Sequence, residues 1–208
     1  MLSDAERLLA ARSDLSRLLA ACFYEPGPEF AEEKMFDAIV AAAKDIAPDL
    51  GAAARRLAAA FTADDLQTLL IDYTRLFLAP EGALAQPYGS VWLTGAQPLM
   101  QESTLDVIAL YAEGGFELAD DFRDLPDHIA AELEFLYTLI FREVQALRQG
   151  DADVAAAVGA LRRRLLTEHL GRSIPPFATA MRAGAQTAFY RELATLTALF
   201  IEREDAIT

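Results

Sequence analysis

The sequence predicts an all-α fold, and three observations support that prediction. Apolar residues recur at spacings of three and four along almost the whole chain, as on the buried face of a helix. No sustained stretch alternates apolar and polar residues, as a half-buried strand would. Alanine, the strongest helix former, occurs 41 times in the 208 residues. We therefore expect one globular multi-helix domain over residues 1–208, with no sheet.

Two helices are predicted in the first quarter of the chain. Ser3 and Glu6 have the spacing of a capping box, which favours a helix start. This helix ends where prolines and a glycine follow one another at 26–28. A second helix is expected over about 30–46, because Pro48 follows it.

The next two predicted helices lead into a long connection. A short helix is expected over about 51–61, and Thr62 with Asp65 has the spacing of a cap for the helix that follows. The connection at 79–89 contains two prolines and two glycines. It is also a possible hinge between two helical halves, so both a monomer and a domain-swapped dimer stay open.

The pattern in the second half of the chain predicts five further helices. One runs from about 99 to 113, and Pro126 suits the first turn of a long helix because its missing N–H needs no partner there. Gly150 and Asp151 separate this long helix from the next one. After Gly171 the prolines at 175 and 176 predict the start of a short helix. The last helix carries an apolar stripe formed by Phe189, Leu193, Leu196 and Phe200.

Charge, cysteine content and hydropathy exclude several classes of function. The formal net charge is −14, which argues against nucleic acid as a partner, since phosphate backbones bind to basic surfaces. The only cysteine is Cys22, so neither an intrachain disulfide nor a CxxC site can form. The longest apolar run, 38–43, is too short for membrane insertion, and the amino terminus lacks the pattern of a signal peptide. A cytoplasmic protein is expected.

Motifs typical of enzymes are missing from the sequence. It contains no phosphate-binding loop, dinucleotide-binding motif, nucleophile elbow or HExxH zinc motif. We therefore expect neither an enzyme nor a bound cofactor or metal. The alternative is a metal-dependent hydrolase using Asp127, His128 and Glu132, because residues four apart share one helix face. The simpler interpretation is that Asp127 favours the helix dipole and His128 makes a hydrogen bond.

The negative charge is concentrated in one quarter of the chain. Residues 81–135 carry one basic and eleven acidic side chains, and so a net charge of −10. The same segment contains Tyr88, Trp92, Phe116 and Phe122, largely in the predicted connections. Such a surface suits a cationic, partly apolar peptide. Alternatively, the aromatic residues are buried and the carboxylates only keep the protein soluble.

Several short elements, in this order from about the third helix onward, form a pattern found in a known family. They are Tyr73-Thr74-Arg75-Leu76-Phe77, Pro87-Tyr88-Gly89-Ser90-Val91-Trp92, Glu102-Ser103-Thr104, the stretch 124–135 with Asp127-His128, Glu168-His169-Leu170, Pro175-Pro176-Phe177 and Phe189-Tyr190. Together they resemble the TorD/DmsD/NarJ family of redox enzyme maturation proteins, which are cytoplasmic chaperones of molybdoenzymes.

The resemblance implies an all-helical chaperone whose partner is the catalytic subunit of a molybdopterin-dependent oxidoreductase. Such a chaperone would bind the twin-arginine signal peptide and the apoprotein, assist cofactor insertion and delay export until folding is complete. The resemblance assigns peptide binding to Tyr88, Gly89, Ser90, Trp92, Pro126, Asp127 and His128. One departure concerns Pro126, since many members have proline two residues before the aspartate.

The resemblance and the charge distribution together suggest a binding hypothesis. The apolar part of the peptide would lie in a groove that involves Phe77, Tyr88, Trp92 and Leu99. His128 would position Asp127 or bond the peptide backbone. The arginines would pair with carboxylates among Glu102, Asp120, Asp121, Asp124 and Asp127. A helical adaptor with no role in export is the other alternative that the sequence leaves open.

Overall fold

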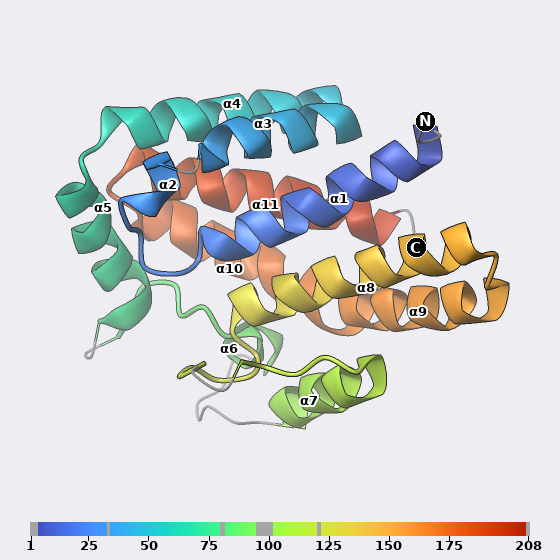
Figure 1. Cartoon of the computed structure of the whole chain (residues 1–208). Coiled ribbons are helices and arrows are strands. Elements are labelled where there is room, and N and C mark those ends of the chain that lie inside the picture. Colours follow the sequence, from blue (N-terminus) through green and yellow to red (C-terminus); the bar gives the residue numbers. More distant parts are fainter. Residues whose placement is uncertain (1–3, 33, 80–81, 95–101, 120–121, 207–208) are drawn as a thin grey trace.

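The computed structural model describes residues 4–32, 34–79, 82–94, 102–119 and 122–206. Within these ranges nearly all regular structure is helical, and no strand forms (Figure 1). Among the described residues, the one extended pairing is an isolated antiparallel bridge between Tyr88 and His128. The predicted all-α class is therefore confirmed.

The helices follow one another with short connections over most of the chain. In chain order they are α1 (Asp4–Ala21), α2 (Glu29–Glu32), α3 (Met35–Ile46), α4 (Pro48–Ala63), α5 (Leu66–Tyr73), the π-helical turn η1 (Thr74–Leu78), α6 (Gly89–Thr94), α7 (Glu102–Gly114), α8 (Ile129–Gln149), α9 (Ala152–Arg164), the π-helical turn η2 (Leu165–Leu170), α10 (Gly171–Gly184) and α11 (Ala188–Ala206).

Two antiparallel helix pairs lie on opposite sides of α1 and α11. The pair α3 and α4 lies at the top of Figure 1, and the pair α8 and α9 lies at the lower right. Helix α1 packs on both α3 and α8, while α11 packs on α4 and α10. The first, middle and last parts of the sequence thus share one core.

Aromatic rings fill the centre of that core. Phe77 is 3% exposed and packs on Phe23, Phe177 and Tyr190 with ring centroids 5.6–6.4 Å apart. These four residues come from four different parts of the chain, and each ring removes a large apolar area from water. Phe77, which we had expected to line a peptide groove, therefore lies inside the protein.

Local signals fixed several helix ends as predicted. Gly150 adopts the left-handed conformation, with φ of 73°, and ends α8. The Asp151 side chain then accepts a hydrogen bond from the Val154 N–H at 3.1 Å and caps α9. At α5 the capping residue is Asp65, which accepts from the Thr68 N–H at 2.7 Å. Thr62 takes no part in this cap, because its hydroxyl donates to Ala59 of the preceding turn.

Two predicted boundaries differ in the structure. The helix expected over 30–46 is divided between α2 and α3, because Lys34 has a left-handed φ of 51°. The break expected after Gly171 is not found: α9, η2 and α10 run on without interruption, with both prolines inside α10. Glycine is needed where η2 passes into α10, since a Cβ on Gly171 would lie 2.6 Å from the Leu166 carbonyl oxygen.

The long connection at 79–89 is tied to the helices beside it in its described part. The Ala85 N–H donates to the Leu76 carbonyl at 2.8 Å, and Ala85 is fully buried. No helix of the described residues is long and apolar enough to cross a membrane.

Candidate functional site

The two sequence elements that carried the family resemblance lie side by side. The Gly89 N–H donates to the Asp127 carbonyl at 2.8 Å, and the Ile129 N–H donates to the Pro87 carbonyl at 2.8 Å. These bonds flank the bridge between Tyr88 and His128. Residues 86–90 and 126–129 therefore form one unit, although about forty residues separate them in the sequence.

Asp127 holds this unit together from inside. It is 1% exposed, and its Oδ2 accepts a hydrogen bond from the Ser90 N–H at 2.9 Å, at the start of α6. The carbonyl of Pro126 accepts from the Tyr111 hydroxyl at 2.9 Å. Gly89 and Ser90 are buried as well. These residues fix the position of α6, and none of them presents an exposed polar group.

His128 is the N-cap of α8. Its Nδ1 accepts a hydrogen bond from the Ala130 N–H at 3.1 Å, and its backbone is extended. Because α8 begins at Ile129, Pro126 precedes the helix, and its predicted place in the first turn is wrong. Burial lowers the pKa of His128, and this effect exceeds the opposing influence of the Asp124 and Asp127 charges.

Glu132 lies on α8, is fully buried, and has its carboxyl group next to Gly89. Neither of its carboxyl oxygens has a hydrogen-bond partner in the described part of the chain. Burial raises its pKa well above the usual value, and the nearby charge of Asp127 adds to this shift. Among the described residues no group of three His, Cys, Asp or Glu side chains could hold a metal ion.

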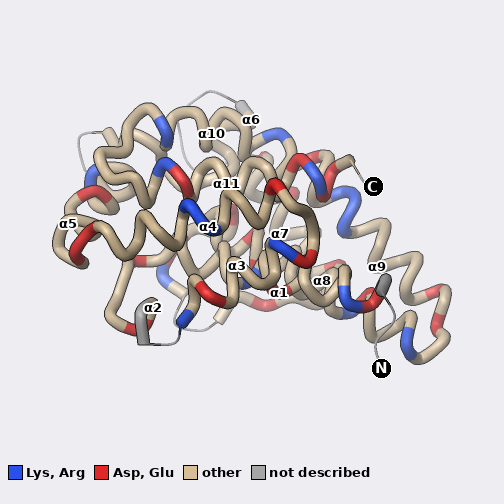
Figure 2. The backbone as a smooth tube through the Cα atoms, turned by 90° about the horizontal axis from the view of Figure 1, so that it is seen from above, with Lys and Arg blue, Asp and Glu red and all other residues tan. Residues whose placement is uncertain are grey.

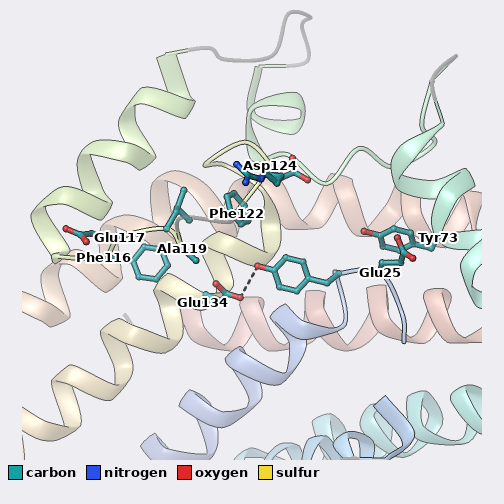
Figure 3. A pocket seen from close by; sticks show the side chains of 11 residues that line it. Glu25, Tyr73, Phe116, Glu117, Ala119, Phe122, Asp124 and Glu134 are labelled. Carbon is teal, nitrogen blue, oxygen red and sulfur yellow. Dashed lines mark hydrogen bonds between the residues drawn. The ribbon is translucent and has the colours of Figure 1, made fainter. Parts of the chain in front are cut away.

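A pocket of about 730 Å³ opens beside His128. It lies between the end of α1, helix α5, the start of α8 and the connection that precedes α8 (Figure 3). In that view Phe122 lies between Asp124 and Glu134, while Tyr73 and Glu25 lie together at one end. The lining is acidic and aromatic and consists of Tyr24, Glu25, Tyr73, Phe116, Glu117, Leu118, Ala119, Phe122, Arg123, Asp124 and Glu134.

Two tyrosines connect this pocket to His128. The Tyr24 hydroxyl donates to Glu134 Oε1 at 2.9 Å, the bond drawn dashed in Figure 3. The Tyr24 ring stacks on the His128 ring with an interplanar angle of 3° and centroids 6.1 Å apart. Tyr88 meets the same imidazole edge-on at 5.7 Å. On the far side, His128 Nε2 lies 3.8 Å from Asp124 Oδ2.

The tyrosines around the pocket stay protonated at neutral pH. Burial raises the pKa of Tyr73 to about 12, with the charges of Asp124 and Glu25 adding to the effect. Burial also raises the pKa of Tyr24 and of Tyr88, and Asp124 contributes to both shifts. Each hydroxyl therefore remains a hydrogen-bond donor beside a carboxylate.

Comparison with known proteins adds to this geometry. The family model described as nitrate reductase delta subunit matches residues 43–179, well over half of the chain. The chain belongs to this family. It is 29% identical over 70% of its length to the chaperone protein TorD of Photobacterium profundum, covering 66% of that protein. It is 30% identical over 71% of its length to TorD of Escherichia coli O7:K1, covering 67% of that protein.

These matches confirm the TorD/DmsD/NarJ resemblance predicted from the sequence. They span about two thirds of the length of the TorD relatives. A solved structure, provisionally assigned as a redox enzyme maturation protein of Archaeoglobus fulgidus, has a TM-score of 0.48 and 19% identity. The match covers 94% of this chain and 92% of that one.

The described carboxylates of segment 81–135 fall into three groups. Glu117, Asp124 and Glu134 line the pocket, whereas Asp127 and Glu132 are buried. The remaining described ones, Glu102, Asp106 and Glu113, are exposed on α7. Figure 2 shows acidic and basic residues interspersed over the rest of the backbone. Part of the local charge thus gathers at one site.

Other predicted residues of the family site have different positions. Trp92 is partly buried, donates its indole N–H to the Gln86 carbonyl at 2.8 Å, and packs edge-on against Phe177. Glu102 is exposed at the start of α7. Leu99, Asp120 and Asp121 lie outside the described residues.

Sequence reasoning did not name Tyr24, Glu25, Tyr73 and Glu134 as residues of the site, nor the lining residues Glu117, Leu118, Ala119 and Arg123 of the connection before α8. Tyr24 and Glu25 directly precede the proline break after the first helix, and an aromatic residue beside an acid in a connection is the one local signal for them. Tyr73 and Glu134 were included in the family elements, but nothing in their spacing connected them to the same site.

Proposed function

We propose that this chain is a cytoplasmic maturation chaperone for a molybdenum-cofactor oxidoreductase. It binds the twin-arginine signal peptide and the apoprotein of the catalytic subunit, assists cofactor insertion, and delays export until folding is complete. Family membership and the relatives named as chaperones support the general role. The acidic and aromatic pocket beside His128 is the observation that carries the peptide-binding part.

The pocket has the charge that a cationic peptide requires. Four carboxylates, those of Glu25, Glu117, Asp124 and Glu134, line it together with one arginine. At 4 Å, one carboxylate attracts one guanidinium by about 4 kcal/mol at the effective dielectric constant of a protein surface, before desolvation is counted. After desolvation, a charged hydrogen bond contributes about 1.5–3 kcal/mol. Two arginines would therefore account for a substantial part of micromolar binding.

The pocket also has apolar walls for the part of the peptide beside its charges. Phe116, Leu118 and Phe122 belong to the connection before α8, and Tyr24 and Tyr73 provide further ring surface. Aromatic faces bind guanidinium groups by cation–π contact as well as apolar side chains. A volume of about 730 Å³ holds a few side chains, so the rest of the peptide would extend over the rim.

The buried residues of the family elements hold the segments that form this site in place. The bonds of Asp127 and Gly89 keep the two segments together, and this pairing sets Tyr88 and His128 at the edge of the pocket. We therefore assign Gly89, Ser90, Pro126 and Asp127 a supporting role, and Asp124 a direct one.

Ordering a flexible signal peptide on the protein costs about 2–5 kcal/mol of the gross interaction energy. The resulting affinity is moderate, which suits a chaperone that must release its client for export. Moderate affinity with a strong electrostatic component is the expected pattern.

Calorimetric titration tests the peptide-binding part. The ligand is a synthetic peptide with two adjacent arginines followed by an apolar stretch, measured at 50 and 300 mM salt. The control peptide carries glutamine in place of both arginines. We expect binding that weakens with salt and is lost in the control. Equal binding of both peptides, or no salt dependence, would contradict the proposal.

Purification of the tagged chain from its native host tests the choice of partner. Under the proposal, the co-purified protein is the cofactor-free catalytic subunit of a molybdenum-cofactor oxidoreductase that still carries its signal peptide. Recovery of the mature, cofactor-loaded enzyme instead would contradict a role before export.

A further inference from the structure

One exposed face of helix α8 continues from the pocket along the outside of the protein. Glu134 lines the pocket, and Tyr137, Thr138 and Phe141 follow it after three, four and seven residues. Residues at these spacings lie on the same side of a helix. Tyr137 and Thr138 are half-buried, whereas Phe141 is 46% exposed. We call the surface formed by Tyr137, Thr138 and Phe141 the α8 strip.

The α8 strip presents mainly apolar atoms. The rings of Tyr137 and Phe141 stack, with centroids 6.0 Å apart and an interplanar angle of 28°. The Thr138 hydroxyl donates to the Glu134 carbonyl at 3.0 Å, so this group is already bonded within the helix. Aromatic residues are enriched at protein interfaces, because they cover a large area with few rotatable bonds. The strip therefore has the character of a docking surface.

Phe141 is connected to the pocket in a way that other exposed apolar residues are not. Leu105 and Ile108 lie on α7, and the others outside α8 lie on further helices or in a connection. Leu147 is on α8, but it follows Glu134 by thirteen residues and so lies on a different side of the helix. Among the described residues, Phe141 is the exposed large apolar side chain that shares a helix face with a pocket residue.

Charge changes along this face of α8. Its first end, at Glu134, belongs to the acidic pocket. Its far end carries Arg148, which pairs with Glu6 of α1 at 3.0 Å. Arg142 borders the strip and donates to the Gly114 carbonyl at the end of α7. Paired arginines are therefore attracted to the pocket end, and an uncharged segment can lie on the strip without burying a charge.

We propose that the α8 strip binds the apolar stretch that follows the paired arginines of the signal peptide, while the arginines themselves occupy the pocket. The inference rests on the proposed function, because it assigns a second part of the same ligand to a second surface. In the groove expected from the sequence, Phe77 is buried in the core and Trp92 packs on Phe177 and donates to Gln86, so the apolar stretch needs another surface.

The length of α8 beyond the pocket suits a helical ligand. From Glu134 to Arg148 the helix extends about 21 Å, since each residue adds about 1.5 Å. A helical stretch of about fourteen residues covers this length, whereas an extended stretch covers it with about six. Because α8 is itself a helix, its backbone groups are already paired and offer no hydrogen bonds to the ligand. A peptide on the strip must satisfy its own backbone, as an amphipathic helix does.

Binding of two peptides to the full-length chain tests the strip. Both peptides carry two adjacent arginines, followed in one by twelve leucine and alanine residues and in the other by a glycine–serine stretch of the same length. By fluorescence anisotropy, we expect the wild type to bind the apolar peptide about tenfold more tightly than the glycine–serine peptide. Phe141→Ser should reduce this ratio to about twofold and leave the affinity for the glycine–serine peptide unchanged.

The matched control is Leu147→Ser. Leu147 lies on the same helix and is 54% exposed, so an effect of surface hydrophobicity alone would be at least as large there as at Phe141. We expect Leu147→Ser to keep the wild-type ratio, and both variants to keep the wild-type circular dichroism and urea midpoint. A wild-type ratio in Phe141→Ser, or an equal loss in both variants, overturns the inference.

A site-specific label gives a second test that removes no residue of the strip. Cys22 is the only cysteine of the sequence and is 1% exposed, so a cysteine introduced at the surface can be labelled alone. Gln145 is exposed and follows Phe141 by four residues. A bimane on Gln145→Cys should be quenched by a tryptophan in the second half of the apolar stretch, whereas a bimane on Leu147→Cys should not. Equal quenching at both positions, or none at Gln145→Cys, contradicts the inference.

A second copy of the chain is a less suitable occupant of the strip. Each copy has a net charge of −14, and a contact through the strip would bring two acidic pockets near one another. Analytical ultracentrifugation without peptide should therefore give the same sedimentation for wild type and Phe141→Ser. A wild-type dimer that Phe141→Ser dissociates would assign the strip to a second copy and overturn the inference.

The outcomes separate this inference from the proposed function. If the wild type prefers the two-arginine to the two-glutamine peptide and Phe141→Ser keeps the wild-type preference for the apolar stretch, the strip is wrong and the proposed function stands. Failure of the wild type to distinguish arginine from glutamine contradicts the proposed function, and the effect of Phe141→Ser on the apolar peptide then decides whether the strip binds an apolar helix.

Discussion

Replacing Glu132 with glutamine should stabilise the protein at neutral pH. Glu132 is 0% exposed, neither carboxyl oxygen has a hydrogen-bond partner among the described residues, and the carboxylate of Asp127 lies nearby. Glutamine has the same shape but no charge to bury. The amide and the protonated acid would both lack hydrogen-bond partners here. The cost of burying an unpaired polar group is therefore similar for the two side chains.

The raised pKa of Glu132 makes the free energy of unfolding of the wild type depend on pH. The unfolded chain releases this proton near the ordinary glutamate pKa of 4.5, whereas burial keeps the proton on the folded protein to a higher pH. The stabilising contribution of the protonated group is thus complete below pH 4.5 and is lost as the pH rises toward the folded pKa. Each pH unit costs about 1.4 kcal/mol, so over the 2.5 units from pH 4.5 to pH 7 the wild type loses at most about 3.5 kcal/mol.

Urea unfolding followed by circular dichroism at pH 4.5, 5.5, 6.5 and 7.5 measures this loss. We expect Glu132→Gln and wild type to unfold at similar urea concentrations at pH 4.5, with the variant gaining steadily at higher pH. Glu102→Gln, an exposed glutamate at the start of α7, is the matched control and should run parallel to wild type. A constant difference between Glu132→Gln and wild type at every pH would refute the reasoning.

Three further predictions concern the support of the site, the core and the pocket. Asp127→Ala removes the acceptor for the buried Ser90 N–H and should lower the free energy of unfolding by about 1–3 kcal/mol in urea titrations. Glu204→Ala removes the buried carboxylate that accepts two hydrogen bonds from Arg12, at 2.5 and 2.6 Å, and should cost about 3–5 kcal/mol in the same assay. Asp124→Asn should weaken binding of the two-arginine peptide about tenfold and reduce its salt dependence, both measured by calorimetry; an unchanged salt dependence would exclude Asp124 as a direct contact.

Features encoded by neighbouring residues could be predicted from the sequence. Helical periodicity gave the all-α class, and the Gly150-Asp151 pair gave the end of one helix and the start of the next. Such features depend on backbone conformation and hydrogen bonds within a few residues. Prediction failed where contacts between distant segments are involved. We expected Pro126 in the first turn of the long helix, but the helix starts after it, at Ile129, where Asp127 and Ile129 make hydrogen bonds to residues 87–90.

The candidate site could be predicted only in part. The family elements and the charge of segment 81–135 pointed to Asp124, Tyr88 and His128, which do lie together. They could not show that Tyr24 completes the site, because Tyr24 lies 110 residues before Glu134, its hydrogen-bond partner, in the sequence.

The sequence by itself determined the helical class, the family and the presence of an acidic segment. Only the tertiary structure decided what each carboxylate does, because its role depends on burial and on partners distant in the chain. Asp124 and Asp127 are three residues apart, yet the first lines a pocket and the second caps a helix inside the protein. That difference arises because residues 86–90 cover Asp127 and leave Asp124 open to the pocket.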